Sequence, residues 1–196
     1  ANTLIIFSSD NGPVLNDGYY DDSDIKNGDH NPWGPFRGGK YSLFEAGTHV
    51  PFFTYWKGEI QPGVSNAMVS QLDLFSSLAQ LVGSDVRTDD SLPLMDLLMG
   101  KSDQGRDELV VEATSRTAFK KGEWVMIPPY KGPSVNEKVQ IELGNYSDFQ
   151  LYNLAKDIGQ KNNLADSLPK KLQEMLTAFD AIRGDGYGET QKLELK

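Results

Sequence analysis

The residues best suited to chemistry lie in two short segments near the start of the chain. The first is SSDNG, residues 8–12, which follows the apolar run LIIF at residues 4–7. Asp10 and Asn11 offer a carboxylate and an amide carbonyl, and such hard oxygen ligands suit Ca²⁺ or Mg²⁺. The apolar run predicts a buried parallel strand. The oxygens would then lie at the carboxyl end of a strand, where ligands bind in open α/β sheets.

The second segment is RGGK, residues 37–40. Paired glycines let the backbone approach a ligand closely, and Arg37 and Lys40 supply positive charge for an anion. Residues 34–40, in which four residues separate Gly34 from Gly39 and Lys40, imitate a P-loop. Tyr41 replaces the required Ser or Thr and Pro35 removes a backbone donor, so nucleotide binding is not expected. Metal ligands and an anion-binding lysine in one stretch indicate an ester of a strong acid.

These residues also have simpler structural interpretations. Asp-Asn-Gly is a common turn sequence, and Lys40 taken alone would be a surface lysine. Arg37 is expected either to contact an anion or to form a structural ion pair with Glu45. His30 taken alone is a solvent-exposed loop histidine.

The elements around these segments indicate an α/β region. Residues 13–36 are rich in Gly, Pro, Asn and Asp and predict a long ordered loop, and residues 50–56 predict a second buried strand. Ser70 is the predicted N-cap of a helix that ends at Gly83, with Asp73 as its cap partner. Apolar residues recur at helical spacing along this segment and form the predicted core face of the helix. This face consists of Leu72, Phe75, Ala79 and Val82.

The C-terminal part predicts a smaller subdomain. Residues 84–107 are polar and broken by Gly and Pro, which places the boundary between predicted domains 1–100 and 101–196. Short strands are expected in four places, with a hairpin around Lys121 and Gly122. They are residues 108–113, 117–121, 123–127 and 150–152. A helix from Ser167 to Gly184 would cover this antiparallel sheet.

Composition excludes several classes of protein. The chain has 28 acidic and 19 basic residues and a net charge of −9, so nucleic acid is not an expected partner. Cysteine is absent, which excludes disulfides and thiolate metal sites. A mean hydropathy of −0.46 without a long apolar run argues against a membrane span.

Taken together and in order, the motifs resemble the second half of a type I sulfatase of the alkaline-phosphatase superfamily. They are DNG at 10–12, GPFRGGK at 34–40, FEAGTHVP at 44–51, QLDLF at 71–75, FQLYNL at 149–154 and NNLA at 162–165. The resemblance covers nearly the whole chain. It implies a partial αβα sandwich followed by a small C-terminal subdomain with an antiparallel sheet and one packed helix.

The resemblance also implies roles for particular residues. Asp10 and Asn11 would form half of a calcium site, and Lys40 would contact the sulfate oxygens. His30 would lie near the substrate, where it could protonate the leaving alcohol, and Arg37 would contact the anion. His49 stands where most relatives carry arginine, which favours a packed neutral imidazole over an ion pair.

The family's nucleophile is not in this sequence. Sulfatases use a formylglycine made within a Cys/Ser-x-Pro-Ser-Arg motif, and neither form occurs in the 196 residues. We therefore interpret the chain as a fragment whose N-terminal part lies outside this sequence and which is inactive alone. The parent would be a periplasmic or secreted sulfuric ester hydrolase.

Several functional alternatives and partners follow from this interpretation. The expected substrate is a sulfated small molecule or carbohydrate, that is, a sulfate monoester of a sugar or an aryl alcohol. The alternatives are a phosphate or phosphonate monoester hydrolase of the same superfamily, and a non-catalytic binding module derived from a sulfatase half. Uncovered strand edges also predict self-association.

Overall fold

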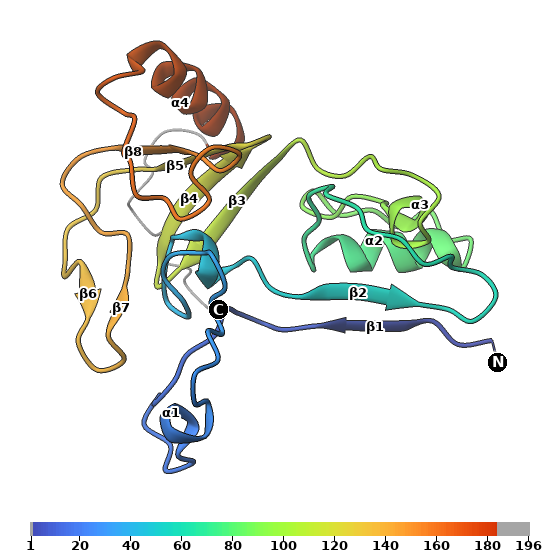
Figure 1. The fold of residues 1–196 in the computed structure, drawn as a ribbon. Coiled ribbons are helices and arrows are strands. Elements are labelled where there is room, and N and C mark those ends of the chain that lie inside the picture. The colour runs from blue at the N-terminus through green and yellow to red at the C-terminus, as the bar shows by residue number, and fades with distance from the viewer. Residues whose placement is uncertain (1, 184–196) are drawn as a thin grey trace, which may run out of the picture. The chain divides into compact units, whose positions relative to one another are not determined.

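The computed structural model describes residues 2–183 (Figure 1). The described chain forms two compact units that do not follow the order of the sequence. The first unit combines residues 2–8 with residues 51–109, and the second combines residues 9–50 with residues 110–183. The contacts thus group the chain differently from the predicted split near residue 100.

In the first unit, the predicted strands at the start of the chain pair with each other. Strand β1 (Ile5–Ser8) runs antiparallel to β2 (Phe52–Tyr55), with Ile5 opposite Tyr55 and Phe7 opposite Phe53. The expectation of a parallel strand is therefore wrong for β1, and the expectation of burial is wrong for both strands, which alternate between exposed and partly buried residues. An apolar run indicates a strand, but it does not encode the direction of the neighbour or the layer that covers it.

One face of this two-stranded sheet is apolar and half exposed. The side chains concerned are Ile5 (50% exposed), Phe7 (52%), Phe53 (55%) and Tyr55 (52%). The Phe7 and Phe53 rings stack with centroids 4.6 Å apart. Such a contiguous patch is typical of a surface that another polypeptide covers.

Helix α2 (Asp73–Leu81) buries the face opposite to the predicted one. Leu72, Phe75 and Val82 are 56%, 53% and 78% exposed, whereas Ser76 and Ser77 are fully buried. The serines bind the loop that precedes helix α3 (Met95–Leu98): the Leu94 amide donates to Ser77 Oγ at 2.9 Å. The inner side of α2 thus combines serines in contact with that loop and Leu74, which packs against the apolar core.

Asp73 connects the start of α2 to distant parts of the first unit. Its fully buried carboxylate accepts backbone hydrogen bonds from Ser70 at 2.8 Å and Leu92 at 2.9 Å. Arg106 donates Nε to Oδ2 at 2.8 Å and Nη2 to Oδ1 at 2.6 Å. The predicted pairing of Asp73 with Ser70 is present, but α2 begins at Asp73 with Leu72 at its N-cap, so the predicted N-cap Ser70 lies two residues too early. The Arg106 pair adds a long-range contact.

The apolar core of the first unit is formed by residues in and directly after α3 and by side chains that pack against them, including Phe52 of β2. Its buried members are Met95, Leu98 and Met99. Six partly buried side chains surround them: Leu4, Phe52, Trp56, Ile60, Val69 and Leu74. Thr54 Oγ1 of β2 donates to the Leu98 carbonyl at 2.7 Å, which holds the sheet against α3.

The second unit contains the predicted antiparallel sheet. Its strands are β3 (Glu108–Ala113), β4 (Arg116–Lys121), β5 (Trp124–Ile127) and β8 (Gln150–Asn153), in the order β3-β4-β5-β8. Helix α4 (Pro169–Arg183) packs on one face of it (Figure 1). The predicted elements are confirmed to within two residues, and the predicted terminator Gly184 lies outside the described residues.

The core between this sheet and α4 is fully apolar. It consists of Phe119, Met126, Leu151, Ala165, Met175 and Phe179, none more than 5% exposed. The β4–β5 hairpin closes through a two-residue turn, because Lys121 pairs with Trp124. Gly122 adopts φ +55° in that turn, a left-handed conformation that glycine reaches without strain.

Several short elements escaped prediction, helix α3 among them. Residues 13–36, expected as loop, contain the one-turn helix α1 (Ser23–Lys26). A 3₁₀ turn, η1, spans Glu45–Gly47, and a ribbon pairs β6 (Val135–Asn136) with β7 (Ile141–Glu142). Among the described residues, no helix combines the length and the apolar character needed to cross a bilayer.

We expect Asp73→Ala to destabilise the chain strongly, because it leaves the Arg106 side chain, 11% exposed, without its counter-charge. Breaking a buried pair of this kind costs about 3–5 kcal/mol in the free energy of unfolding. Urea denaturation measures the loss. Asp96→Ala, which removes an exposed carboxylate from α3, is the control and should change stability by less than about 0.5 kcal/mol. Equal effects of the two variants would contradict the assigned role of Asp73.

Candidate active site

The Asp-Asn-Gly segment lies directly against the η1 turn. The Gly12 amide donates to the Gly47 carbonyl at 2.9 Å. A Cβ atom on Gly12 would lie 1.6 Å from the Ala46 carbonyl oxygen, so no other residue fits here without moving the backbone. Gly12 is therefore needed for close approach of two backbone segments.

The Gly-Lys segment runs beside the same stretch. The Lys40 amide donates to the Pro13 carbonyl at 3.0 Å. A Cβ on Gly39 would come within 2.8 Å of that carbonyl and 2.6 Å of the Trp33 indole nitrogen. The two segments that the sequence singled out thus share one hydrogen-bonded backbone arrangement within the second unit.

The oxygens of Asp10 and Asn11 suit part of a metal site. Asp10 is exposed, and the Asn11 amide nitrogen donates to the Gly12 carbonyl at 2.9 Å, which leaves its side-chain oxygen for another partner. Ca²⁺ takes six to eight oxygen ligands, so this pair fits a partial ligand set. No group of three or more His, Cys, Asp or Glu residues in the described chain is arranged to hold a metal ion.

Lys40 is paired with a residue that sequence reasoning missed. Its ammonium lies 2.7 Å from Asp17 Oδ2, and the Tyr41 hydroxyl donates to Asp17 Oδ1 at 2.8 Å. The hydrogen bond from Lys40 lowers the pKa of Asp17, and the same bond raises the pKa of Lys40. The only signal for this contact in the sequence was the presence of a carboxylate within the predicted ordered loop, residues 13–36.

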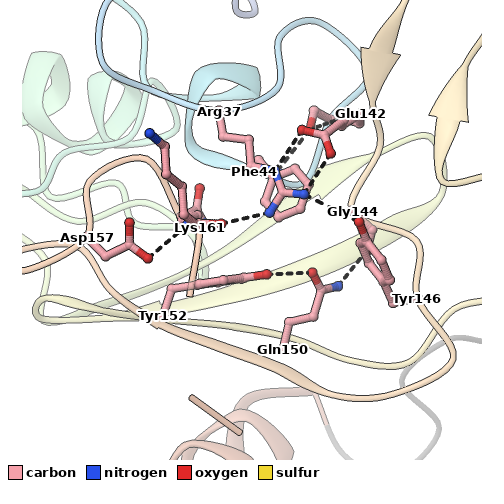
Figure 2. Close-up of polar contacts among 11 residues, drawn as sticks. Arg37, Phe44, Glu142, Gly144, Tyr146, Gln150, Tyr152, Asp157 and Lys161 are labelled. Atoms are coloured by element: carbon pink, nitrogen blue, oxygen red, sulfur yellow. Dashed lines mark hydrogen bonds and ion pairs between the residues drawn. The ribbon is translucent and has the colours of Figure 1, made fainter. Parts of the chain in front are cut away.

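Arg37 binds Glu142 instead of the predicted partner Glu45, and Figure 2 shows the arrangement. Its Nε and Nη2 atoms donate to the two Glu142 oxygens at 2.7 Å each, and Nη1 donates to the Gln160 carbonyl at 2.7 Å. The guanidinium also lies 3.9 Å from the centroid of the Phe44 ring. The bidentate pair raises the pKa of Arg37 and lowers the pKa of Glu142. Most of this guanidinium's donors are engaged within the protein.

Glu45 has two cationic neighbours of its own. The carboxylate is 4% exposed and lies 2.9 Å from Lys120 Nζ and 2.8 Å from His49 Nδ1. Burial acts to raise the pKa of Glu45, but His49 and Lys120 outweigh it and lower that pKa. His49 stacks on Phe36 with centroids 4.4 Å apart and is 54% exposed at its side chain. The expected packed imidazole is thus a half-exposed ring held by a buried carboxylate.

His30 lies outside this set of contacts. It is exposed in the turn that follows α1, and its backbone amide donates to the Asn27 carbonyl at 3.1 Å. Trp33 lies closer to the Gly-Lys segment, with its indole nitrogen buried and without a hydrogen-bond partner among the described residues. A substrate role for His30 stays a prediction.

Known proteins similar to this chain are sulfatases. A family model described as Sulfatase matches residues 1–84. The N-acetylgalactosamine-6-O-sulfatase of Bacteroides thetaiotaomicron is 38% identical over 186 residues, which cover 93% of this chain and 36% of that protein. Arylsulfatase A of Homo sapiens is 28% identical over 196 residues, which cover 92% of this chain and 37% of that protein.

Solved structures agree with this result. A sulfatase from the glycosaminoglycan metabolism of Bacteroides thetaiotaomicron superposes with a TM-score of 0.87 at 37% identity, covering 92% of this chain and 38% of that one. A structure in complex with its substrate D-glucosamine-2-N,6-O-disulfate, at 14% identity and a TM-score of 0.63, shares the fold alone.

The fold is therefore that of the alkaline-phosphatase-like hydrolases, in mixed α/β form with antiparallel sheets and a C-terminal helix, as predicted. The chain belongs to the sulfatase family. It spans little more than a third of the length of the relatives it matches, the N-acetylgalactosamine-6-O-sulfatase among them.

We expect Glu45→Gln to destabilise the chain in a pH-dependent way. At pH 7 it leaves Lys120, with a side chain 10% exposed, without its counter-charge, at a cost of about 3 kcal/mol. The folded pKa of Glu45 is lowered, so the stabilisation is present above the unfolded pKa and is lost as pH falls through the folded value. The gap between wild type and variant should therefore narrow below about pH 4.

Urea denaturation at neutral and acid pH measures this gap. Glu59→Gln removes an exposed carboxylate and is the matched control. A gap that stays constant across the pH range would show that Glu45 is not stabilised as a carboxylate.

Proposed function

We propose that this chain is the part of a sulfatase, a hydrolase of sulfate monoesters, that supplies two metal ligands and the lysine that binds the sulfate group. The observation that carries the proposal is the hydrogen bond from the Lys40 amide to the Pro13 carbonyl. It brings the Gly-Lys segment alongside the Asp-Asn-Gly segment. Metal-binding oxygens and an anion-binding ammonium thus come from adjacent backbone.

Asp10 and Asn11 would hold the metal through one carboxylate and one amide oxygen. Sulfatases use a metal ion and a formylglycine, and the donor chemistry here favours a hard cation such as Ca²⁺. When bound, such an ion neutralises negative charge on the sulfate oxygens. The remaining ligands and the formylglycine would come from polypeptide outside these 196 residues, so this chain alone would be inactive.

The Lys40 ammonium would stabilise the negative charge that develops on the sulfate group as the S–O bond breaks. His30, on the exposed loop after α1, would donate a proton to the leaving alcohol. Arg37 would act mainly through structure, because Glu142 and Gln160 hold its guanidinium. A contact between Arg37 and the anion would use the N–H bonds that these partners leave.

The substrate class we propose is a sulfated carbohydrate or a sulfated aryl alcohol. Support comes from similarity to the Bacteroides N-acetylgalactosamine-6-O-sulfatase and to Homo sapiens arylsulfatase A. We propose a periplasmic or secreted location, which suits an enzyme that acts on extracellular sugar sulfates. We also retain the proposal that residues 1–100 belong to the catalytic domain and residues 101–196 to a smaller subdomain.

Turnover of aryl esters tests the function. We expect the natural polypeptide that carries this sequence to hydrolyse p-nitrophenyl sulfate with Ca²⁺ and to prefer it to p-nitrophenyl phosphate. Lys40→Met should lower kcat/KM at least about 100-fold, as the loss of an oxyanion-binding group does. Asp10→Asn should weaken Ca²⁺ binding.

Asp29→Asn changes an exposed carboxylate of the same loop and serves as the control. A strong preference for phosphate would instead support a phosphate monoester hydrolase. Absence of turnover, in a polypeptide that carries the nucleophile motif, would support a binding module.

We further propose that the isolated chain self-associates through the β1–β2 sheet, because its apolar face is half exposed. Light scattering should show an average mass that rises with concentration. The double variant Phe7→Ser and Phe53→Ser should shift the chain toward the monomer. The double variant Tyr19→Ser and Tyr20→Ser, at exposed loop aromatics, should not. A monomeric wild type at high concentration would refute self-association.

A further inference from the structure

The ammonium proposed to bind sulfate already has a negative neighbour. Asp17 Oδ2 lies 2.7 Å from Lys40 Nζ, and the two side chains are 20% and 29% exposed. The Tyr41 hydroxyl binds the other oxygen, Oδ1, at 2.8 Å. Asp17 is thus held from two sides beside the anion-binding group.

The backbone around this pair is constrained as well. The backbone of Tyr41 has φ +77°, in the left-handed region that residues other than glycine rarely adopt. Lys40 Nζ lies 5.2 Å from the centroid of the Tyr41 ring. The hydrogen bond from Lys40 lowers the pKa of Asp17, which favours an ionised carboxylate at neutral pH. Together these contacts keep a full negative charge close to Lys40.

This charge acts differently on the two classes of ester. A sulfate monoester carries one negative charge, whereas a phosphate monoester carries two above its second pKa of about 6. An anion oxygen bound to Lys40 would lie about 5 Å from the Asp17 carboxylate, and at that distance each unit of charge lowers affinity by roughly 4-fold in water and over 100-fold in a protein-like dielectric. The repulsion from Asp17 applies once to sulfate and twice to phosphate, and so does the attraction to Lys40. Asp17 therefore offsets part of the advantage that Lys40 alone would give to the dianion.

We propose that Asp17 is a specificity-determining residue, which shifts the preference of the Lys40 site away from dianionic phosphate monoesters and toward monoanionic sulfate monoesters. The inference rests on the proposed function, because it assigns the anion to Lys40. Asp17 does not contact the reacting atoms in this proposal. Its effect is electrostatic and passes through the ion pair with Lys40.

Equilibrium binding to the full 196-residue chain tests this, because no turnover is then required. Backbone NMR signals of residues 38–41 are followed during titration with methyl sulfate and with methyl phosphate at pH 8 and constant ionic strength. We expect Asp17→Asn to tighten methyl sulfate binding about 10-fold and methyl phosphate binding about 100-fold, one and two units of charge respectively. The sulfate-to-phosphate affinity ratio should fall about 10-fold in consequence.

Three further variants complete the test. Asp17→Glu keeps the carboxylate and should keep the wild-type ratio, which separates charge from loop structure. Asp29→Asn removes an exposed loop carboxylate and should also leave the ratio unchanged. Lys40→Met should abolish binding of both esters.

An unchanged ratio in Asp17→Asn, with both esters still bound, would overturn the inference. So would failure of both esters to bind either wild type or variant, because Lys40 would then offer no anion site in this chain. The turnover assay of the natural polypeptide is separate, so failure of the sulfatase assignment would be seen there and not in these affinity ratios.

Discussion

The candidate site depends on a backbone contact that only glycine permits. At Gly12 a Cβ atom would overlap the Ala46 carbonyl, and at Gly39 it would crowd the Pro13 carbonyl. Two glycines, one in each segment, therefore allow the Asp-Asn-Gly tip to lie against the η1 turn and the Gly-Lys segment. The proposal of one ligand shared by side chains of both segments rests on this close approach of the backbone.

Charged side chains then attach this compact loop structure to two strands of the second unit that belong to different sheets, β4 and β7. Glu45 of η1 pairs with Lys120 of β4, and Arg37 pairs with Glu142 of β7. Breaking one partner of such pairs is costly, although the intact pair adds little net stability over an apolar contact. Their value is in orientation: the loop that carries Lys40 is held by strands of the same compact unit. Strands β4 and β7 thus hold the loop without contributing proposed ligands.

The first unit presents a different problem. Its sheet exposes Phe7 and Phe53, and α2 exposes Leu72, Phe75 and Val82, although the interior of this unit includes buried serines and an ion pair. Apolar side chains outside and polar groups inside are the reverse of the usual pattern for a self-sufficient domain. The chain also spans only 36% of its Bacteroides relative. Both facts fit a region whose apolar faces are covered by further polypeptide of a sulfatase.

The sequence by itself determined those features that depend on neighbouring residues. Alternation and turn residues were sufficient for β3, β4, β5 and β8, and helical periodicity for α4, because the side-chain repeats of a strand and of a helix are visible within a few neighbouring residues. Residue types alone also identified the Asp-Asn-Gly and Gly-Lys segments and the order of motifs that marks a sulfatase.

Tertiary structure decided the direction of β1, the buried face of α2 and the long-range partners of Arg37, Lys40 and Glu45. Arg37 and Glu142 are 105 residues apart, and Glu45 and Lys120 come from different elements. Asp17 reaches Lys40 across 23 residues. Local patterns carry no information on such pairs, because the energy of a long-range contact depends on how the whole chain brings the two groups together.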